Sequence, residues 1–334
     1  MTSRPPRIAV LIPCFNEEVA IKDTVEAFRC ALPEATVYVY DNNSVDHTVA
    51  RALEAGAVVR HEPLQGKGHV VRRMFSDVEA DIYIITDGDA TYDASSARRM
   101  VDLLVEQNLD MVVGKRVHKE QAAYRAGHVL GNRMLTGFLA RLFGRRFSDI
   151  LSGYRAFSRR FVKSFPALAR GFETETELTV HALTLNLPIA EVDTAYGARP
   201  AGSASKLRTF RDGVRILRVM LQLFKNERPL AFFGLAALLL GLISVLLGIP
   251  VFVEYFEIGQ VPRFPTAIAA ASIMVLAFLS LASGFVLDTV THGRREAKRM
   301  AYLATPSLAA LLEMPVEEVS APSATRRVRP APSA

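Results

Sequence analysis

Two carboxylates, Asp87 and Asp89, flank Gly88 directly after the apolar segment 82–86. Carboxylates at positions i and i+2, on a turn that leaves a buried strand, can share a hard divalent cation. Mg²⁺ and Mn²⁺ prefer oxygen ligands and are often completed by the phosphates of a substrate. A single Asp-x-Asp is weak evidence, because aspartate is frequent in ordinary turns. The pair therefore indicates a metal site only if other polar turns converge on it.

Three further polar turns occur earlier in the chain, at 13–17, 41–48 and 66–68. The carboxylate of Asp41 could accept a hydrogen bond from a base N–H, and the backbone near Pro13 could flank the same base. Each turn also has an ordinary structural interpretation, such as an aspartate that caps a helix N-terminus. Together the four turns predict one polar crevice.

Alternating short apolar and amphipathic segments predict an α/β fold. The expected strands are 7–12, 36–40, 58–61, 82–86 and 110–114, and the expected helices begin at Asn16 and cover 46–55, 67–79 and 95–107. This alternation is typical of a Rossmann-like, mostly parallel sheet with helices on both faces. Its polar turns fall at the carboxyl ends of strands, where such sheets bind ligands. No G-x-G-x-x-G or G-x-x-x-x-G-K-[ST] occurs, so neither a dehydrogenase nor a P-loop enzyme is indicated.

The ordered set of motifs resembles glycosyltransferase family 2. The motifs are Pro-x-x-Asn-Glu at 13–17, Asp-Asn-Asn-Ser-x-Asp-x-Thr at 41–48, Gly-Lys-Gly at 66–68 and Asp-Gly-Asp at 87–89. This resemblance implies a GT-A fold, a nucleotide-sugar donor, a divalent metal (Mg²⁺ or Mn²⁺) and inversion at the sugar carbon.

Later motifs narrow the resemblance to the dolichyl-phosphate mannose synthase branch. They are Asp-Ile-Leu-Ser-Gly-Tyr-Arg at 149–155, Gly-Phe-Glu at 171–173, Glu-Val at 191–192, Tyr-Gly-Ala-Arg at 196–199 and Ser-Lys-Leu at 205–207. The resemblance covers roughly residues 7–228. Two C-terminal apolar segments, 229–253 and 264–287, are similar to the membrane anchor of bacterial polyprenyl-phosphate glycosyltransferases.

The resemblance implies a role for each matching position. Nucleotide-sugar binding is expected for Pro13, Asn16, Glu17, Asp41, Asn43, Lys67, Asp87 and Gly88. Asp87 and Asp89 are expected to hold the metal, and Arg116, Arg199, Ser205 and Lys206 to contact the lipid phosphate. Catalytic roles are expected for Asp149, Arg155 and Arg133. Asp149 could act as a base, orient another group, or simply pair with an arginine.

Two departures from the wider family are informative. Close relatives often carry Leu-Gln after Asp-x-Asp, where this chain has Ala90-Thr91, so no third metal ligand is assigned. Processive polysaccharide synthases use a Gln-x-x-Arg-Trp motif, but this chain contains no tryptophan. Chain-elongating synthesis is therefore not expected.

Two uncharged segments, 229–253 and 264–287, are each long enough to cross a bilayer. A pair of buried core helices is the alternative, but uncharged stretches of this length are rare in soluble cores. Segment 207–228 combines apolar residues at helical spacing with several arginines, as interfacial helices do, although a solvated helix packed on the domain fits the same pattern. Basic residues flank the outer ends of the apolar pair, so the positive-inside rule predicts cytoplasmic termini.

The expected organisation is a cytosolic catalytic domain at 1–206, an interfacial helix at 207–228 and a transmembrane hairpin. The hairpin comprises helices at 229–253 and 264–290 with an external loop at 254–263, and a largely disordered cytosolic tail covers 291–334. The net charge is +6, but the basic residues cluster near the apolar segments, so nucleic-acid binding is not favoured. The two cysteines suit a reducing compartment.

The expected activity is inverting transfer of a hexose-type sugar, from a UDP-sugar in preference to a GDP-sugar, to a polyprenyl phosphate such as undecaprenyl phosphate. The expected place is the cytosolic face of the plasma (inner) membrane, and a homo-oligomer is compatible with the sequence. Three alternatives remain: transfer to a soluble or protein acceptor, a non-catalytic membrane scaffold, and a lipid flippase, for which two helices are few.

Overall fold

The computed structural model describes residues 4–118, 136–138, 140–141, 147–169, 173–200 and 209–313. The chain divides into two compact units. The first comprises Met1–Tyr124, Arg146–Ser205 and Ala301–Ala334, and the second comprises Arg125–Arg145 and Lys206–Met300.

The first unit is built on a seven-stranded sheet in the order β3-β2-β1-β4-β6-β5-β7. The strands are β1 (Ile8–Cys14), β2 (Thr36–Asp41), β3 (Val58–His61), β4 (Ile82–Ile85), β5 (Met111–His118), β6 (Arg155–Ser158) and β7 (Ile189–Tyr196). Strand β6 runs antiparallel to β4 and β5, and the other neighbours are parallel. The predicted mostly parallel sheet is confirmed. The six parallel strands therefore end at one edge of the sheet, and β6 begins there.

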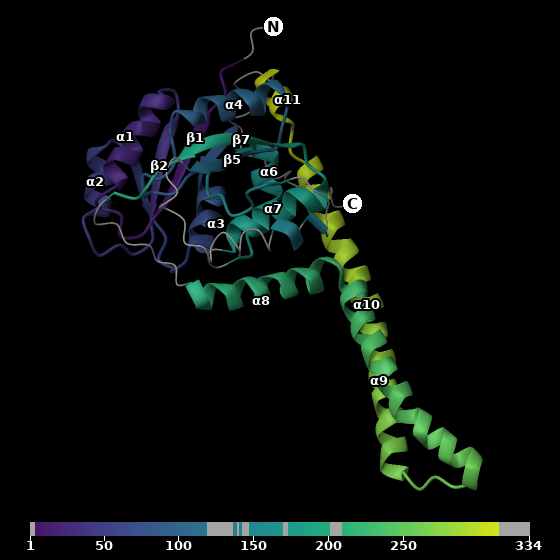
Figure 1. Cartoon of the computed structure of the whole chain (residues 1–334). Helices are drawn as coiled ribbons and strands as arrows, with labels where there is room; N and C mark the ends of the chain where they lie inside the picture. The colour runs from purple at the N-terminus through teal and green to yellow at the C-terminus, as the bar shows by residue number, and fades with distance from the viewer. Residues whose placement is uncertain are drawn as a thin grey trace, which may run out of the picture. The chain divides into compact units, whose positions relative to one another are not determined.

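Helices cover both faces of this sheet (Figure 1). They are α1 (Ile21–Ala31), α2 (Thr48–Glu54), α3 (Lys67–Asp77), α4 (Ser96–Glu106), α6 (Arg159–Ser164) and α7 (Thr174–Leu185). Apolar residues of α1, α2 and α4 pack on one face against β1 side chains such as Val10 and Ile12. Those of α3, α6 and α7 pack on the other face against Leu11. Because side chains alternate along a strand, β1 contributes to both layers of core.

The first predicted helix begins later than expected. Asn16 adopts a positive φ of 53° and lies in an irregular turn, and α1 begins at Ile21. The side-chain oxygen of Asn16 accepts a hydrogen bond from the backbone N–H of Val45 at 2.9 Å. This bond ties the turn after β1 to the turn after β2, so the chain is held at the strand ends before the helix starts.

The predicted disordered tail is wrong for its first part. Helix α10 (Phe264–Leu303) continues well beyond residue 290, and α11 (Leu308–Glu313) follows it. Leu308 and Leu311 are 2% and 3% exposed, and Leu308 belongs to the core formed by α1 and α4. The reason is burial: Leu308 forms part of that core, and Leu312 packs against it. Residues 314–334 lie outside the described part of the chain.

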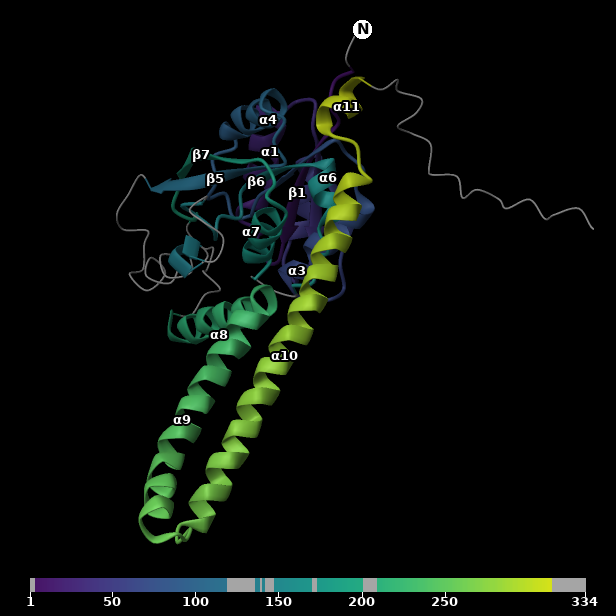
Figure 2. The ribbon, with the colours of Figure 1, turned by 90° about the vertical axis from the view of Figure 1, so that its right-hand side faces the viewer.

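The second unit contains α8 (Thr209–Glu227), α9 (Pro229–Ile258) and most of α10. Helices α9 and α10 lie side by side as an antiparallel pair (Figure 2). Small side chains recur every seven residues along the buried seam of α10, at Ala270, Ala277, Gly284 and Thr291. Both helices are long and apolar enough to cross a membrane by length and composition. Only 6% of the most apolar stretch of α9 is buried, whereas a core helix of a soluble protein is mostly buried.

Candidate active site

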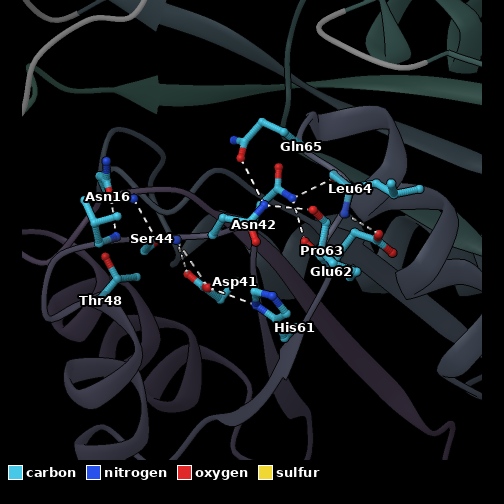
Figure 3. Close-up of polar contacts among 12 residues, drawn as sticks. Asn16, Asp41, Asn42, Ser44, Thr48, His61, Glu62, Pro63, Leu64 and Gln65 are labelled. Atoms are coloured by element: carbon cyan, nitrogen blue, oxygen red, sulfur yellow. Dashed lines mark hydrogen bonds and ion pairs between the residues drawn. The ribbon is translucent and has the colours of Figure 1, made fainter.

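The turns after β1 and β2 interlock through side-chain hydrogen bonds (Figure 3). Pro13 lies within β1, two residues before the turn. The backbone N–H of Asn16 donates to Ser44 Oγ at 2.9 Å, and that of Glu17 donates to Thr48 Oγ1 at 2.8 Å. Asn43 has a positive φ of 66°. The motif residues of both turns therefore form one rigid rim at the carboxyl edge of the sheet.

Asp41 is buried at the end of β2, where His61 from the end of β3 approaches it. His61 Nδ1 lies 3.2 Å from Asp41 Oδ2, and the backbone N–H of Ser44 lies 3.3 Å from each carboxylate oxygen. The carboxylate is thus held in one orientation. The sequence did not single out His61.

Asn42 braces the loop that precedes α3 (Figure 3). Its side-chain amide donates to the carbonyl oxygens of Glu62 and Leu64, both at 2.8 Å. Its carbonyl oxygen accepts from the backbone N–H of Gly66 at 2.7 Å. Three bonds from one buried side chain thereby determine where α3 begins, and so where Lys67 lies.

Lys67, the first residue of α3, bridges two carboxylates. Its ammonium lies 2.6 Å from Asp87 Oδ1 and 2.5 Å from Glu175 Oε1 on α7. Burial acts to lower the pKa of Lys67, but Asp87 and Glu175 outweigh it and raise that pKa above the ordinary value. Burial acts to raise the pKa of Asp87, yet Lys67 brings it below the usual range. Lys67 and Asp87 are therefore both charged at neutral pH.

Asp89 is almost fully buried and is held from two sides. Thr91 Oγ1 donates to Asp89 Oδ1 at 2.6 Å, and the Arg199 guanidinium lies 2.6 Å from Asp89 Oδ2. Burial raises the pKa of Asp89 above its usual value, and the neighbouring charge of Asp87 adds to this effect. Gly197 N donates to the carbonyl of Thr91 at 2.8 Å, which ties the end of β7 to this turn and so brings Arg199 to it.

Two glycines allow the chain to pack tightly around these carboxylates. A Cβ on Gly88 would lie 2.7 Å from Cys14 Sγ, and a Cβ on Gly153 would lie 2.8 Å from Asp87 Oδ2. Both separations are shorter than real Cβ contacts. Gly88 therefore has a structural reason beside its expected role in nucleotide binding, and Gly153 is an unpredicted neighbour of Asp87.

Asp149 pairs with Arg116, on β5, rather than with Arg155. Arg116 Nε and Nη2 lie 2.7 Å and 2.8 Å from the two carboxylate oxygens. Glu191 accepts hydrogen bonds from the backbone N–H groups of Ser148 and Asp149 at 2.8 Å and 3.2 Å. This pairing was one of the alternatives that the sequence left open.

Arg155 lies inside the fold. It is 1% exposed, and its guanidinium donates to the carbonyl oxygens of Ser152 (2.9 Å) and Ile150 (2.5 Å) and to Thr179 Oγ1 (2.9 Å). Burial lowers its pKa to about 10. Through these contacts Arg155 holds the 149–153 loop from inside, and its expected catalytic role stays a prediction. Arg133, Ser205 and Lys206 lie outside the described residues.

The side chains at this edge suit a divalent cation. Within the described residues, no group of three or more His, Cys, Asp or Glu side chains could enclose a metal ion. Asp87 and Asp89 instead offer two carboxylates, each already paired with a cationic side chain. Two carboxylates completed by substrate phosphates are a common Mg²⁺ arrangement. The oxygen donors therefore fit such an ion on a bound diphosphate.

Comparison with known proteins gives the class of this chain. The sequence model of "Glycosyl transferase family 2" matches residues 9–165. Glycosyltransferase AglJ of Haloferax volcanii is 35% identical over 232 residues, which are 69% of this chain and 76% of AglJ. The chain belongs to glycosyl transferase family 2, and it is a glycosyltransferase.

Two further comparisons are informative. The dolichol-phosphate mannosyltransferase of Pyrococcus furiosus is 23% identical over 213 residues, covering 60% of this chain and 59% of that protein. The glucosyl-3-phosphoglycerate synthase of Mycobacterium tuberculosis, solved with Mn²⁺, UDP and phosphoglyceric acid, superposes with a TM-score of 0.54 at 21% identity. That match covers 66% of this chain and 78% of the solved chain and confirms the expected GT-A fold.

Proposed function

We propose that this glycosyltransferase carries out inverting transfer of a hexose-type sugar from a nucleotide diphosphate sugar to a polyprenyl phosphate. The observation that carries the proposal is the clustering of charge at one edge of the sheet. Asp87 and Asp89 face Lys67 and Arg199 there. Two carboxylates with two cations beside them can bind a metal–diphosphate group, which a set of neutral side chains cannot.

The donor nucleotide binds the rim formed by the turns after β1 and β2. The fixed carboxylate of Asp41 accepts a hydrogen bond from the base, flanked by the backbone near Pro13. Asn16, Glu17 and Asn43 shape this rim. Uridine is the preferred base, supported by the UDP in the related-fold synthase.

Asp87 and Asp89 would hold Mg²⁺ or Mn²⁺ beside the diphosphate. When bound, the ion acts as a Lewis acid that stabilises the negative charge gained by the leaving diphosphate. Mn²⁺ accompanies UDP in the synthase of related fold, which supports this cofactor. The ammonium of Lys67 pairs with Asp87 and supplies a further positive charge next to the leaving group.

The acceptor is a phosphate that needs positioning rather than deprotonation. By analogy with phosphorylated side chains, its second pKa is about 6, so it is mostly ionised at neutral pH. Guanidinium groups pair bidentately with phosphate. Arg116 and Arg199, which pair with Asp149 and Asp89, are candidates for this contact, and Arg133, Ser205 and Lys206 are further candidates. Asp149 orients Arg116 for this contact. The relationship to a dolichol-phosphate mannosyltransferase supports a lipid phosphate.

The apolar helices α9 and α10 anchor the enzyme in the membrane. We assign residues 229–253 and 264–290 to the spans, with both termini and the catalytic unit in the cytoplasm of the cell. The amphipathic helix α8 lies in the membrane interface. Tethering the catalytic unit to the bilayer raises its effective concentration for a lipid acceptor.

The test is incubation of membranes that contain this chain with radiolabelled nucleotide sugars and undecaprenyl phosphate. We expect label in the lipid phase with one UDP-sugar, and loss of that label when EDTA removes divalent ions. Asp89→Asn serves as the inactive control. Product stereochemistry, read by NMR of the anomeric proton, should be inverted relative to the donor.

Each alternative acceptor gives a distinct result in this assay. Label that enters protein or a soluble sugar without any lipid phosphate would favour a non-lipid acceptor. No label from any donor in any fraction, together with full biological effect of the Asp89→Asn variant, would favour a scaffold and overturn the proposal.

A further inference from the structure

Two cationic side chains form ion pairs with Asp87 and Asp89, the two carboxylates that suit a metal ion. Lys67 lies 2.6 Å from an oxygen of Asp87, and Arg199 lies 2.6 Å from an oxygen of Asp89. They come from distant parts of the chain, the start of α3 and the segment after β7. Each carboxylate therefore has a counter-charge that the chain itself supplies.

We propose that Lys67 and Arg199 are exchangeable counter-cations that couple the binding of a divalent ion to the binding of the donor diphosphate. They neutralise Asp87 and Asp89 in the donor-free enzyme and pair with the diphosphate once the metal takes the carboxylates. This inference rests on the proposed function, because it assumes a metal-dependent diphosphate donor.

The charge balance of the site supports coupling. Counted with every side chain in its ionised form, Asp87, Asp89 and Glu175 contribute three negative charges and Lys67 and Arg199 two positive ones, a formal net charge of minus one. A bare divalent ion would change this to plus one in a largely buried site, where unbalanced charge is costly. The ion together with a doubly negative nucleotide sugar leaves the net charge unchanged.

Geometry supports the same conclusion. A divalent ion that used the oxygens of Asp87 and Asp89 would lie within a few ångströms of the ammonium and the guanidinium, and like charges repel at that range. Lys67 is only 13% exposed, so it cannot simply turn into water. Glu175 holds its other side at 2.5 Å and can retain it next to the site while it releases Asp87. A diphosphate offers both cations new partners.

The test is isothermal titration calorimetry on the full chain in detergent, with Mn²⁺ alone, UDP alone, GDP alone, and Mn²⁺ in the presence of each nucleotide. We expect weak binding of bare Mn²⁺ and a nucleotide-dependent increase in Mn²⁺ affinity of about 5- to 150-fold, the usual range of coupling between sites. If neither nucleotide raises Mn²⁺ affinity, the proposal is wrong.

Lys67→Met and Arg199→Met give the sharper result. Removing either cation should raise the affinity for bare Mn²⁺ and reduce the coupling, which no purely structural role would produce. Lys163→Met, which removes a lysine paired with Glu79 at the surface of the same unit, should leave both quantities unchanged. Unchanged or weaker binding of bare Mn²⁺ in both cation variants, with coupling intact, would overturn the proposal.

Loss of Lys67 leaves Asp87 and Glu175 facing each other and could weaken folding. The double variant Lys67→Met/Glu175→Gln removes one charge of each sign and keeps the test valid, with circular dichroism to verify the fold. The outcomes also separate the two proposals. Sugar transfer to lipid without coupling overturns only the counter-cation role, whereas coupling without transfer overturns only the lipid acceptor.

Discussion

Arg116 and Asp149 form a two-point ion pair in which both carboxylate oxygens of Asp149 are engaged, at 2.7 Å and 2.8 Å. Burial acts to raise the pKa of Asp149, but the hydrogen bonds from Arg116 outweigh it and bring that pKa below its usual range. A carboxylate with a lowered pKa is a weak proton acceptor near neutral pH. The pair is therefore suited to orienting the guanidinium rather than to removing a proton.

The first prediction concerns pH dependence. The lowered pKa of Asp149 means that its stabilising contribution is present above the unfolded value of about 3.9 and is lost only as pH falls through the lower folded value. Protonation of Asp149 should therefore cause no fall in the pH–rate profile between pH 5 and 8. We expect the rate to fall on the acid side near the second pKa of the acceptor phosphate, about 6, and we call this part of the profile its acid limb.

Asp149→Asn tests this directly. It leaves Arg116 without its counter-charge, and a misplacement of about 1 Å can reduce the rate about 10²-fold. We expect kcat/KM to fall by about that factor while the acid limb keeps its position in the pH–rate profile. Disappearance of the limb in the variant would instead identify Asp149 as the general base.

The second prediction concerns Gly153, which lies against Asp87. A methyl group at this position would lie 2.8 Å from Asp87 Oδ2, so Gly153→Ala should displace the carboxylate. We expect kcat/KM to fall about 10²-fold, as for other small displacements of a reacting group. Mn²⁺-dependent UDP binding, measured by calorimetry, should weaken in parallel.

A matched control for Gly153→Ala is Gly234→Ala, whose added methyl meets no atom within 4 Å. It should leave both kcat/KM and UDP binding unchanged. If Gly153→Ala kept full UDP binding, close packing against Asp87 would not be needed for donor binding.

Much of the sheet and its polar rim could be predicted from the sequence. The apolar strands that end in Asp41 or precede Asp87 can be recognised locally, because the apolar pattern and the turn residues that follow it both lie within a short stretch of sequence. The link between Lys67 and Glu175 could not be read in this way, because 108 residues separate them. Only the packing of α7 on the sheet brings the two together.

The contacts of Arg155 and the helix α11 could not be predicted, for related reasons. Arginine is rarely fully buried, so a motif arginine is naturally interpreted as a catalytic residue. Two of the partners of Arg155 are backbone carbonyls, which carry no sequence signal, and the third, Thr179, lies 24 residues away in the sequence. Helix α11 contributes two buried leucines from a segment of six residues, too short for a periodic pattern to stand out.

The third prediction concerns α11 as part of the catalytic unit. Leu308 is 2% exposed, so Leu308→Ala should reduce the stability of the catalytic unit by about 3 kcal/mol, a typical value for a buried leucine. Thermal unfolding of the full chain in detergent measures this as a lower Tm. Leu303→Ala, at a position that is 67% exposed, should have little effect. Equal Tm values for the two variants would show that α11 is dispensable.

The fourth prediction concerns the buried guanidinium of Arg155. Replacing it with lysine keeps the charge but removes the planar fork that bonds Ser152, Ile150 and Thr179 together. Because buried carbonyl oxygens would lose their donors, we expect Arg155→Lys to reduce stability by about 3 kcal/mol. The loss should appear as a lower Tm.

The kinetics of Arg155→Lys distinguish a positioning role from a catalytic one. A residue that only holds the 149–153 loop should impair binding of the donor and the rate together, and glycerol or lower temperature should recover part of the activity by restoring the loop. Arg98→Lys, which keeps an exposed pairing with Glu34, is the control and should change neither Tm nor rate, since exposed ion pairs contribute little. If Arg155→Lys kept the Tm of the unchanged protein but lost the rate alone, Arg155 would act on the substrate after all, and the 149–153 loop would have to open to expose it.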